Sequence, residues 1–186
     1  MSTSSTALAD LERQRADLLA DVGRWPAADV AFRPAPGAWS AAEVLDHLVR
    51  TERGILEDAV RGLAAPHALG ARDRVGGWFI DRVFRSDRRV RVPQSALARV
   101  GPDPATDLPR VAGEWAAVRG DLARFVAPLA PRQLRGGVFR HPVAGWMSVP
   151  QVLRFFWVHA HHHGFQLARL RAAAEPRAGA AAERAP

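Results

Sequence analysis

Four of the seven histidines stand within five consecutive positions, in the segment His-Ala-His-His-His at residues 159–163. In a helix, His159 and His163 are one turn apart, about 6 Å along the axis, and share a face. Two imidazoles at this spacing can each give a ring nitrogen to one divalent ion. The alternative is a pair of core histidines hydrogen bonded to neighbouring groups. His161 and His162 point to other faces, so at least one is expected to be exposed or to support the site indirectly.

A three-histidine metal site would need its third ligand from another part of the chain. His47 lies in a predicted helix, at the flank of an apolar stripe, and is one candidate. Its neighbour Asp46 is an alternative oxygen ligand, although it should face further outward. His67 and His141 lie in predicted loops. For His47 alone, a polar residue at the boundary of the core is the competing interpretation.

The elements that must position these histidines are helical. Apolar residues recur at helical spacing, with charged residues between them, and predict four helices over residues 6–22, 41–63, 107–128 and 149–173. Ser40 with Glu43, and Ser148 with Gln151, have the spacing of capping boxes at two of the helix starts. Residues 78–84 could form a further short helix, residues 93–104 are expected to be loop, and no strand pattern is visible. The fold class is therefore all-α, most simply a four-helix bundle.

The composition describes one domain with a sizeable core. The chain has 186 residues, of which 48% are apolar and 24% charged. We expect a single domain over residues 1–174 and a flexible tail over residues 175–186. The absence of cysteine excludes disulfides, thiolate metal sites and cysteine nucleophiles, and suits a reducing compartment. No signal peptide or membrane-spanning run is visible, so a cytoplasmic protein is expected.

The net charge of +7 comes from 26 basic residues, all of them arginine. Acidic residues are interleaved with them, and no motif of a nucleic-acid-binding family is present. The densest basic stretch, residues 82–91, is interpreted as a solvated surface, with an anion-binding patch as the alternative. The expected partner is a small-molecule substrate rather than nucleic acid or a membrane, and a homodimer remains open.

Several segments together resemble the DinB/YfiT-like family. The sequence FRPAPGAWSAAEVLDHL, residues 32–48, is similar to the family's loop and second helix. LAPRQL at residues 129–134 fits the turn after the third helix, and HPVAGWMS at residues 141–148 is similar to the segment before the last helix. The family pattern H-x-x-H-H-x-x-Q is then matched by His159, His162, His163 and Gln166.

This resemblance implies a bundle with up-down-down-up connectivity, in which a long crossover accounts for the irregular residues 64–106. It also implies a divalent metal ion, zinc or nickel, held by His47, His159 and His163, with His162 and Gln166 as supporting residues. The sequence departs from the family where His161 adds a histidine and where Phe165 replaces a commonly small residue.

Three neutral histidines leave a divalent ion with open positions, which is typical of catalytic rather than structural sites. The resemblance suggests a transferase that activates a low-molecular-weight thiol, or alternatively a metal-dependent hydrolase. A non-catalytic stress-response or binding protein is the competing hypothesis. The sequence has no H-E-x-x-H motif, Glu-x-x-His pair, P-loop or Gly-x-Gly-x-x-Gly motif, so those enzyme classes are excluded.

Overall fold

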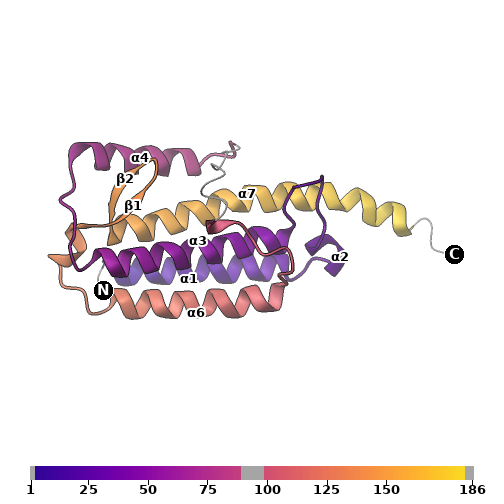
Figure 1. Ribbon diagram of the computed structural model, residues 1–186. Helices are drawn as coiled ribbons and strands as arrows, with labels where there is room; N and C mark the ends of the chain where they lie inside the picture. Colours follow the sequence, from indigo (N-terminus) through magenta and orange to yellow (C-terminus); the bar gives the residue numbers. More distant parts are fainter. Residues whose placement is uncertain (1–2, 89–98, 183–186) are drawn as a thin grey trace.

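A computed structural model describes residues 3–88 and 99–182 of the chain. Four long helices lie side by side as a bundle (Figure 1). They are α1 (Thr3–Val22), α3 (Ala41–Gly62), α6 (Leu108–Val126) and α7 (Val149–Ala182). The prediction of an all-α four-helix bundle is confirmed.

The connectivity of the bundle is up-down-down-up. Helices α1 and α7 run in one direction and α3 and α6 in the other (Figure 1), and both α1 and α3 pack against α6 and α7. Because α3 and α6 are parallel, the chain must return along the length of the bundle between them. Helix α4 (Ala71–Phe84), which packs outside the bundle on α7, makes the first part of this crossover.

The starts of three helices show how local sequence sets the boundaries. Ser40 and Glu43 form the predicted capping box: the Ser40 hydroxyl accepts from the Glu43 N–H, and the Glu43 carboxylate accepts from the Ser40 N–H. At α7 only half of the predicted box forms, because Gln151 Oε1 accepts from both the N–H and the hydroxyl of Ser148. Asp107 caps α6 by accepting from the Arg110 N–H.

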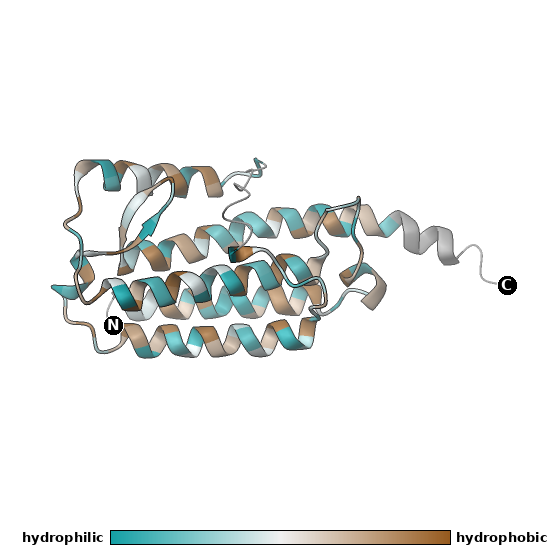
Figure 2. Ribbon diagram, viewed as in Figure 1, coloured by the Kyte–Doolittle hydropathy of each residue, from teal (hydrophilic) through white to brown (hydrophobic). Residues whose placement is uncertain are grey.

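Amphipathic helices enclose the core, and apolar and polar residues are interspersed along each helix (Figure 2). One polar group lies deep between α3 and α6. Glu52 is fully buried and accepts hydrogen bonds from Trp115 Nε1 at 3.0 Å and from Arg119 Nη2 at 2.7 Å. Burial raises the pKa of this carboxyl, and the Arg119 guanidinium opposes that shift.

A β-hairpin corrects the expectation that the chain contains no strands. Strands β1 (Gly137–His141) and β2 (Gly145–Ser148) pair antiparallel, after a single 3-10 turn, η1 (Gln133–Arg135). The strands are too short and too irregular in register for an alternating pattern to be visible in the sequence. The turn between them depends on Gly145, whose φ of +79° suits glycine, and on His141 Nδ1, which accepts from the Val143 and Ala144 N–H groups.

Helix boundaries differ from the predicted ones in three places. Helix α4 begins at Ala71, seven residues before the predicted start at residue 78, and a short helix, α2 (Ala27–Val30), follows α1. Helix α7 continues to Ala182, so most of the expected tail over residues 175–186 is helical. Of the expected loop over residues 93–104, only residues 99–104 lie in the described part of the chain.

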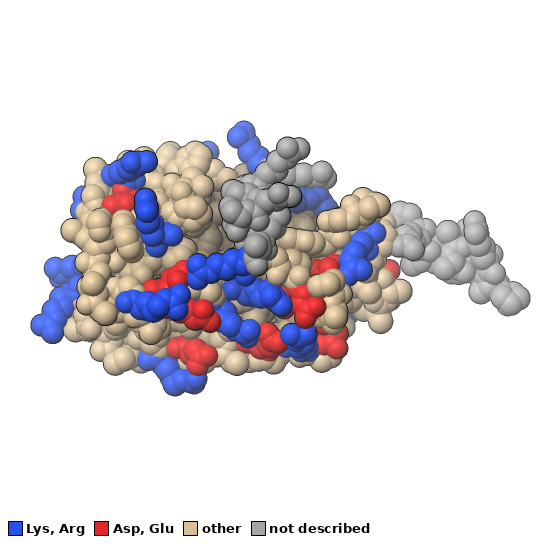
Figure 3. Space-filling model, viewed as in Figure 1, with Lys and Arg blue, Asp and Glu red and all other residues tan. Residues whose placement is uncertain are grey.

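Charges on the visible face of the bundle are interleaved, as expected. Arginines and acidic residues alternate over α3 and α6 (Figure 3), where Arg53 and Arg110 both pair with Glu114. In the basic stretch beginning at Arg82, the described residues include an ion pair between Arg85 and Asp81. None of the described helices combines the length and the apolar character needed to cross a membrane.

Candidate metal centre

The structure brings together one histidine of α3 and two of α7. His47, His159 and His163 each offer a ring nitrogen, and these atoms lie within 4.8 Å of one another. All three side chains are buried, with exposed fractions of 2%, 6% and 8% respectively. The cluster arises because the i, i+4 pair of α7 faces the part of α3 that carries His47.

Hydrogen bonds orient two of the three rings. His47 Nδ1 lies 2.7 Å from the carbonyl oxygen of Val100, and His163 Nδ1 lies 2.9 Å from Gln166 Oε1. Because both acceptors are oxygens, each Nδ1 carries the proton and each Nε2 is unprotonated. His47 and His163 therefore both present Nε2 as the atom available to a metal ion.

His159 completes the set. Its Nε2 lies 3.1 Å from the Nε2 of His163, while its buried Nδ1 has no hydrogen-bond partner. The His159 ring stacks on Phe155, with ring centroids 5.2 Å apart, and meets the edge of Phe84 at 5.4 Å. This histidine is thus held by apolar packing and by its contact with His163.

Electrostatics keep these rings neutral. Burial lowers the pKa of His47, and burial with the neighbouring histidines lowers the pKa of His159 well below its usual value. Burial lowers the pKa of His163 to about 3. Since a histidine must be neutral to bind a metal, the cluster is prepared for a cation at neutral pH.

The donor set fits a divalent metal ion. Three neutral imidazoles on two facing helices offer nitrogen ligands of the type that zinc and nickel take. Three protein ligands would leave positions on such an ion for a small molecule. Helix bundles commonly build metal sites in this way, from side chains of facing helices.

The other predicted site residues lie around the cluster. Gln166 contacts His163 directly, as described above. The His162 ring meets the His163 ring edge-on, with centroids 5.6 Å apart, but its Nδ1 lies 3.0 Å from the Ser86 carbonyl oxygen. His161, on a third face of α7, stacks on Trp157 with ring centroids 5.3 Å apart. Neither is among the residues that the structure brings together as a ligand set.

Asp46 corrects a prediction. We expected its side chain to face outward as an alternative oxygen ligand, but it is only 2% exposed. Its Oδ2 accepts hydrogen bonds from the Asp103 N–H at 2.7 Å and from Arg50 Nε at 2.9 Å. The carboxylate is therefore engaged by the segment before α6 and not by the histidine cluster.

Two contributors to the site were not predicted from the sequence. The Val100 carbonyl oxygen orients His47, and Phe84, from the crossover helix, packs on His159 and His162. A backbone carbonyl leaves no signature in the sequence, because every residue has one. For Phe84, the sequence offered one indication, the short helix predicted over residues 78–84.

Comparisons with known proteins place the chain in a family. Residues 10–167 match the DinB superfamily. No curated protein is similar enough to match. Among solved structures, the chain is similar to YfiT from Bacillus subtilis, described as a probable metal-dependent hydrolase with an unusual four-helix bundle topology. The TM-score is 0.63 and the identity 15%, over 96% of this chain and 90% of that chain, so this likeness concerns the fold.

Proposed function

The chain belongs to the DinB superfamily, and we propose that it is a metal-dependent enzyme whose ion is held by His47, His159 and His163. The observation that carries this proposal is the convergence of three buried, neutral imidazoles from two facing helices within 4.8 Å. Zinc or nickel is the proposed ion, because imidazole nitrogen suits both. When bound, such an ion lowers the pKa of a small nucleophile at its open position and stabilises the resulting anion.

The protein's own residues would position that chemistry. His47 and His163 are fixed by the Val100 carbonyl and by Gln166, so little reorganisation is needed on binding. Phe84 and Phe155 pack on His159 and make that side of the site apolar, which limits water there. A less watery site strengthens electrostatic stabilisation of an anionic nucleophile.

We propose a low-molecular-weight thiol as the nucleophile of a transferase, with water in a hydrolase as the second candidate. The thiol follows from the resemblance of residues 32–48 and 159–167 to the family's motifs. The hydrolase is supported by the description of YfiT, whose fold this chain shares. The interleaved surface charges are consistent with a small-molecule substrate rather than nucleic acid (Figure 3).

A turnover assay separates these functions. The purified protein would be analysed for metal, then assayed with an electrophile and a panel of thiols, and separately with a panel of esters. Each assay would be run with zinc, with nickel and with a chelator. We expect turnover that requires metal and is lost in His159→Ala, while His161→Ala, a substitution on another face of α7, retains it.

Each outcome of the assay has a distinct meaning. Activity that survives complete chelation would contradict the proposed mechanism. Metal-dependent ester hydrolysis without thiol transfer would favour the hydrolase. Stoichiometric metal binding with no turnover of either panel would favour a non-catalytic binding protein.

A further inference from the structure

Residues 101–105, directly after Val100, form no helix or strand and are hydrogen bonded to α3 through Asp46. We refer to residues 99–105 as the strap. Because most of the strap lacks helix or sheet hydrogen bonds, its position depends on the side chains that tether it. The position of the strap matters, because Val100 in the strap accepts the Nδ1 proton of His47.

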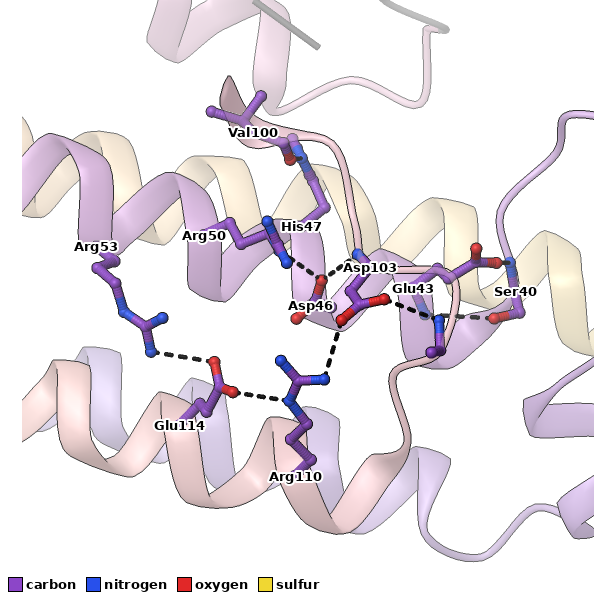
Figure 4. A network of polar contacts seen from close by, with 11 residues as sticks. Ser40, Glu43, Asp46, His47, Arg50, Arg53, Val100, Asp103, Arg110 and Glu114 are labelled. Atoms are coloured by element: carbon purple, nitrogen blue, oxygen red, sulfur yellow. Dashed lines mark hydrogen bonds and ion pairs between the residues drawn. The ribbon is translucent and has the colours of Figure 1, made fainter. Parts of the chain in front are cut away.

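Two adjacent residues of α3 hold two points of the strap. His47 bonds the Val100 carbonyl, and Asp46 Oδ2 accepts from the Asp103 N–H at 2.7 Å (Figure 4). Asp46 is 2% exposed, so its hydrogen bond to the partly exposed Asp103 is partly buried. The carbonyl that orients His47 is therefore only three residues from a buried anchor.

Exposed arginines hold the strap at three further points: Arg99 itself, the Asp103 carboxylate and, through Arg33 Nη2, the Pro104 carbonyl. Arg99 Nη2 lies 2.8 Å from Asp58 Oδ2 on α3, and Arg110 Nη1 on α6 lies 2.9 Å from Asp103 Oδ2 (Figure 4 shows the second pair). The Arg99 and Arg110 side chains are 57% and 47% exposed, so each pair contributes less than a buried contact would. The side chain of Asp46 is buried, in contrast to these arginines.

We propose that Asp46 is a positioning residue for the metal site. By holding the strap at Asp103, Asp46 keeps the Val100 carbonyl hydrogen bonded to His47 Nδ1. The His47 Nε2 atom therefore keeps facing the two histidines of α7. This inference rests on the proposed metal-binding function. It assigns to Asp46 the role of orienting a ligand rather than acting as one. Without the anchor, Val100 moves away, His47 samples its other tautomer and other ring positions, and the affinity for the ion falls.

The test compares variants at Asp46 by zinc affinity, measured by competition with a chromophoric chelator, so that no turnover is needed. Asp46→Ala removes the acceptor and should weaken zinc binding by about 10- to 100-fold, the usual effect of losing a group that orients a metal ligand. Asp46→Asn keeps an acceptor oxygen for the Asp103 N–H and should recover most of the affinity. Arg50→Ala is the matched control, because Arg50 contacts the same carboxylate oxygen but not the strap. It should change the affinity by less than about fivefold, the factor for an exposed ion pair.

A second measurement follows His47 directly in the metal-free protein. Long-range proton–nitrogen NMR spectra distinguish the Nδ1–H and Nε2–H tautomers of each histidine. The wild type should show His47 as Nδ1–H, and Asp46→Ala should show a mixture, whereas the Gln166-bonded ring of His163 should stay unchanged. A general loss of structure would affect both rings alike.

The outcomes distinguish this proposal from the proposed function. Wild-type zinc affinity in Asp46→Ala, with an unchanged His47 tautomer, would overturn the role of Asp46 and leave the metal site intact. A wild type that binds no zinc or nickel would overturn both. Should Asp46→Ala not fold, Asp103→Ala, which keeps the N–H that Asp46 accepts, is the control for Asp103→Pro, which removes that N–H and should lower the affinity about tenfold. Unchanged affinity in a folded Asp103→Pro variant would overturn the proposal.

Discussion

At the scale of single residues, the site depends on keeping imidazoles neutral in a buried place. The three clustered histidines, with His141 and His162, have pKa values lowered by burial, to about 3 for His163 and about 4 for His141. Keeping lone pairs free costs stability when the unfolded chain can bind protons that the folded chain cannot. Burial therefore has two consequences: it keeps the imidazoles neutral and able to bind a metal ion, and it makes the folded state less stable at low pH.

The ligand assignment predicts which alanine substitutions lose the metal. His47→Ala, His159→Ala and His163→Ala should each abolish stoichiometric binding of zinc or nickel, measured by isothermal titration calorimetry and metal analysis. Loss of one ligand of three should exceed the roughly 10- to 100-fold effect of losing a supporting group. His161→Ala should bind as the wild type does, because its ring stacks on Trp157 instead. A His161→Ala variant that lost the metal, beside a His159→Ala variant that kept it, would mean that the wrong face of α7 was assigned.

The pKa shifts predict acid destabilisation of the metal-free protein. Unfolded histidines bind protons below about pH 6.5, whereas folded His163 does so only near pH 3. Between these values the unfolded state binds more protons, so the free energy of unfolding falls as the pH falls. Each histidine that is protonated in the unfolded state but neutral in the folded state lowers the free energy of unfolding by about 1.4 kcal/mol for every pH unit below about 6.5. Urea unfolding of the metal-free protein between pH 7.5 and pH 5 measures this slope, because most carboxyl groups titrate below that range. A free energy of unfolding that stays constant across the range would contradict the prediction.

At the scale of elements, helix starts decide where the ligands lie. Helix α3 places His47 seven residues after its cap, Ser40, so the capping box sets the register of this ligand. Helix α7 begins immediately after β2, and the hairpin and the half-formed box at Ser148 set its start. Similar sequence patterns thus give different local structures at the two helices.

The two caps predict different costs of substitution. Ser40→Ala removes the hydroxyl that accepts from the Glu43 N–H and should lower the free energy of unfolding by about 1 kcal/mol. Ser148→Ala should cost less, because Ser148 bonds Gln151 through its own N–H, which alanine retains. Urea denaturation of both variants, without metal, measures the difference. Equal losses would show that the Ser40 box contributes nothing beyond the general effect of removing a hydroxyl.

At the scale of the whole molecule, the proposed metal site joins two helices far apart in the sequence. Helices α3 and α7 are separated by the crossover, α6 and the hairpin, and their contact includes the His47 interaction with His159 and His163. An ion bound there acts as a cross-link that exists only in the folded state. Binding should therefore stabilise the entire bundle rather than one element.

Metal should raise the thermal stability of the bundle in proportion to the logarithm of its free concentration. At a concentration about 100 times Kd, the expected stabilisation is about 2.7 kcal/mol, or about 5 to 10 °C in Tm for a chain of this size. Thermal unfolding followed by circular dichroism, with and without chelator, measures the shift. His47→Ala should show no shift, and a Tm that rises equally in His47→Ala would place the stabilising ion elsewhere.

The sequence alone determined the helices and half of the site. Periodic apolar residues and caps mark the four bundle helices, because both signals are local and repeat within each element. The His159–His163 pair is visible for the same reason, since one helical turn separates the two residues. The family motifs then pointed to His47 and to the up-down-down-up connectivity.

Only the tertiary structure decided the contacts between segments distant in the chain. It brought His47 onto the α7 pair, buried Asp46 against Asp103 and placed the Val100 carbonyl on His47. It also formed the short hairpin, which depends on packing against α3, α4 and α7 more than on its own alternation. Local sequence sets the period of a helix, but which partner covers a given face depends on how all the apolar faces are buried together. Backbone acceptors such as Val100 are found only once that packing is known.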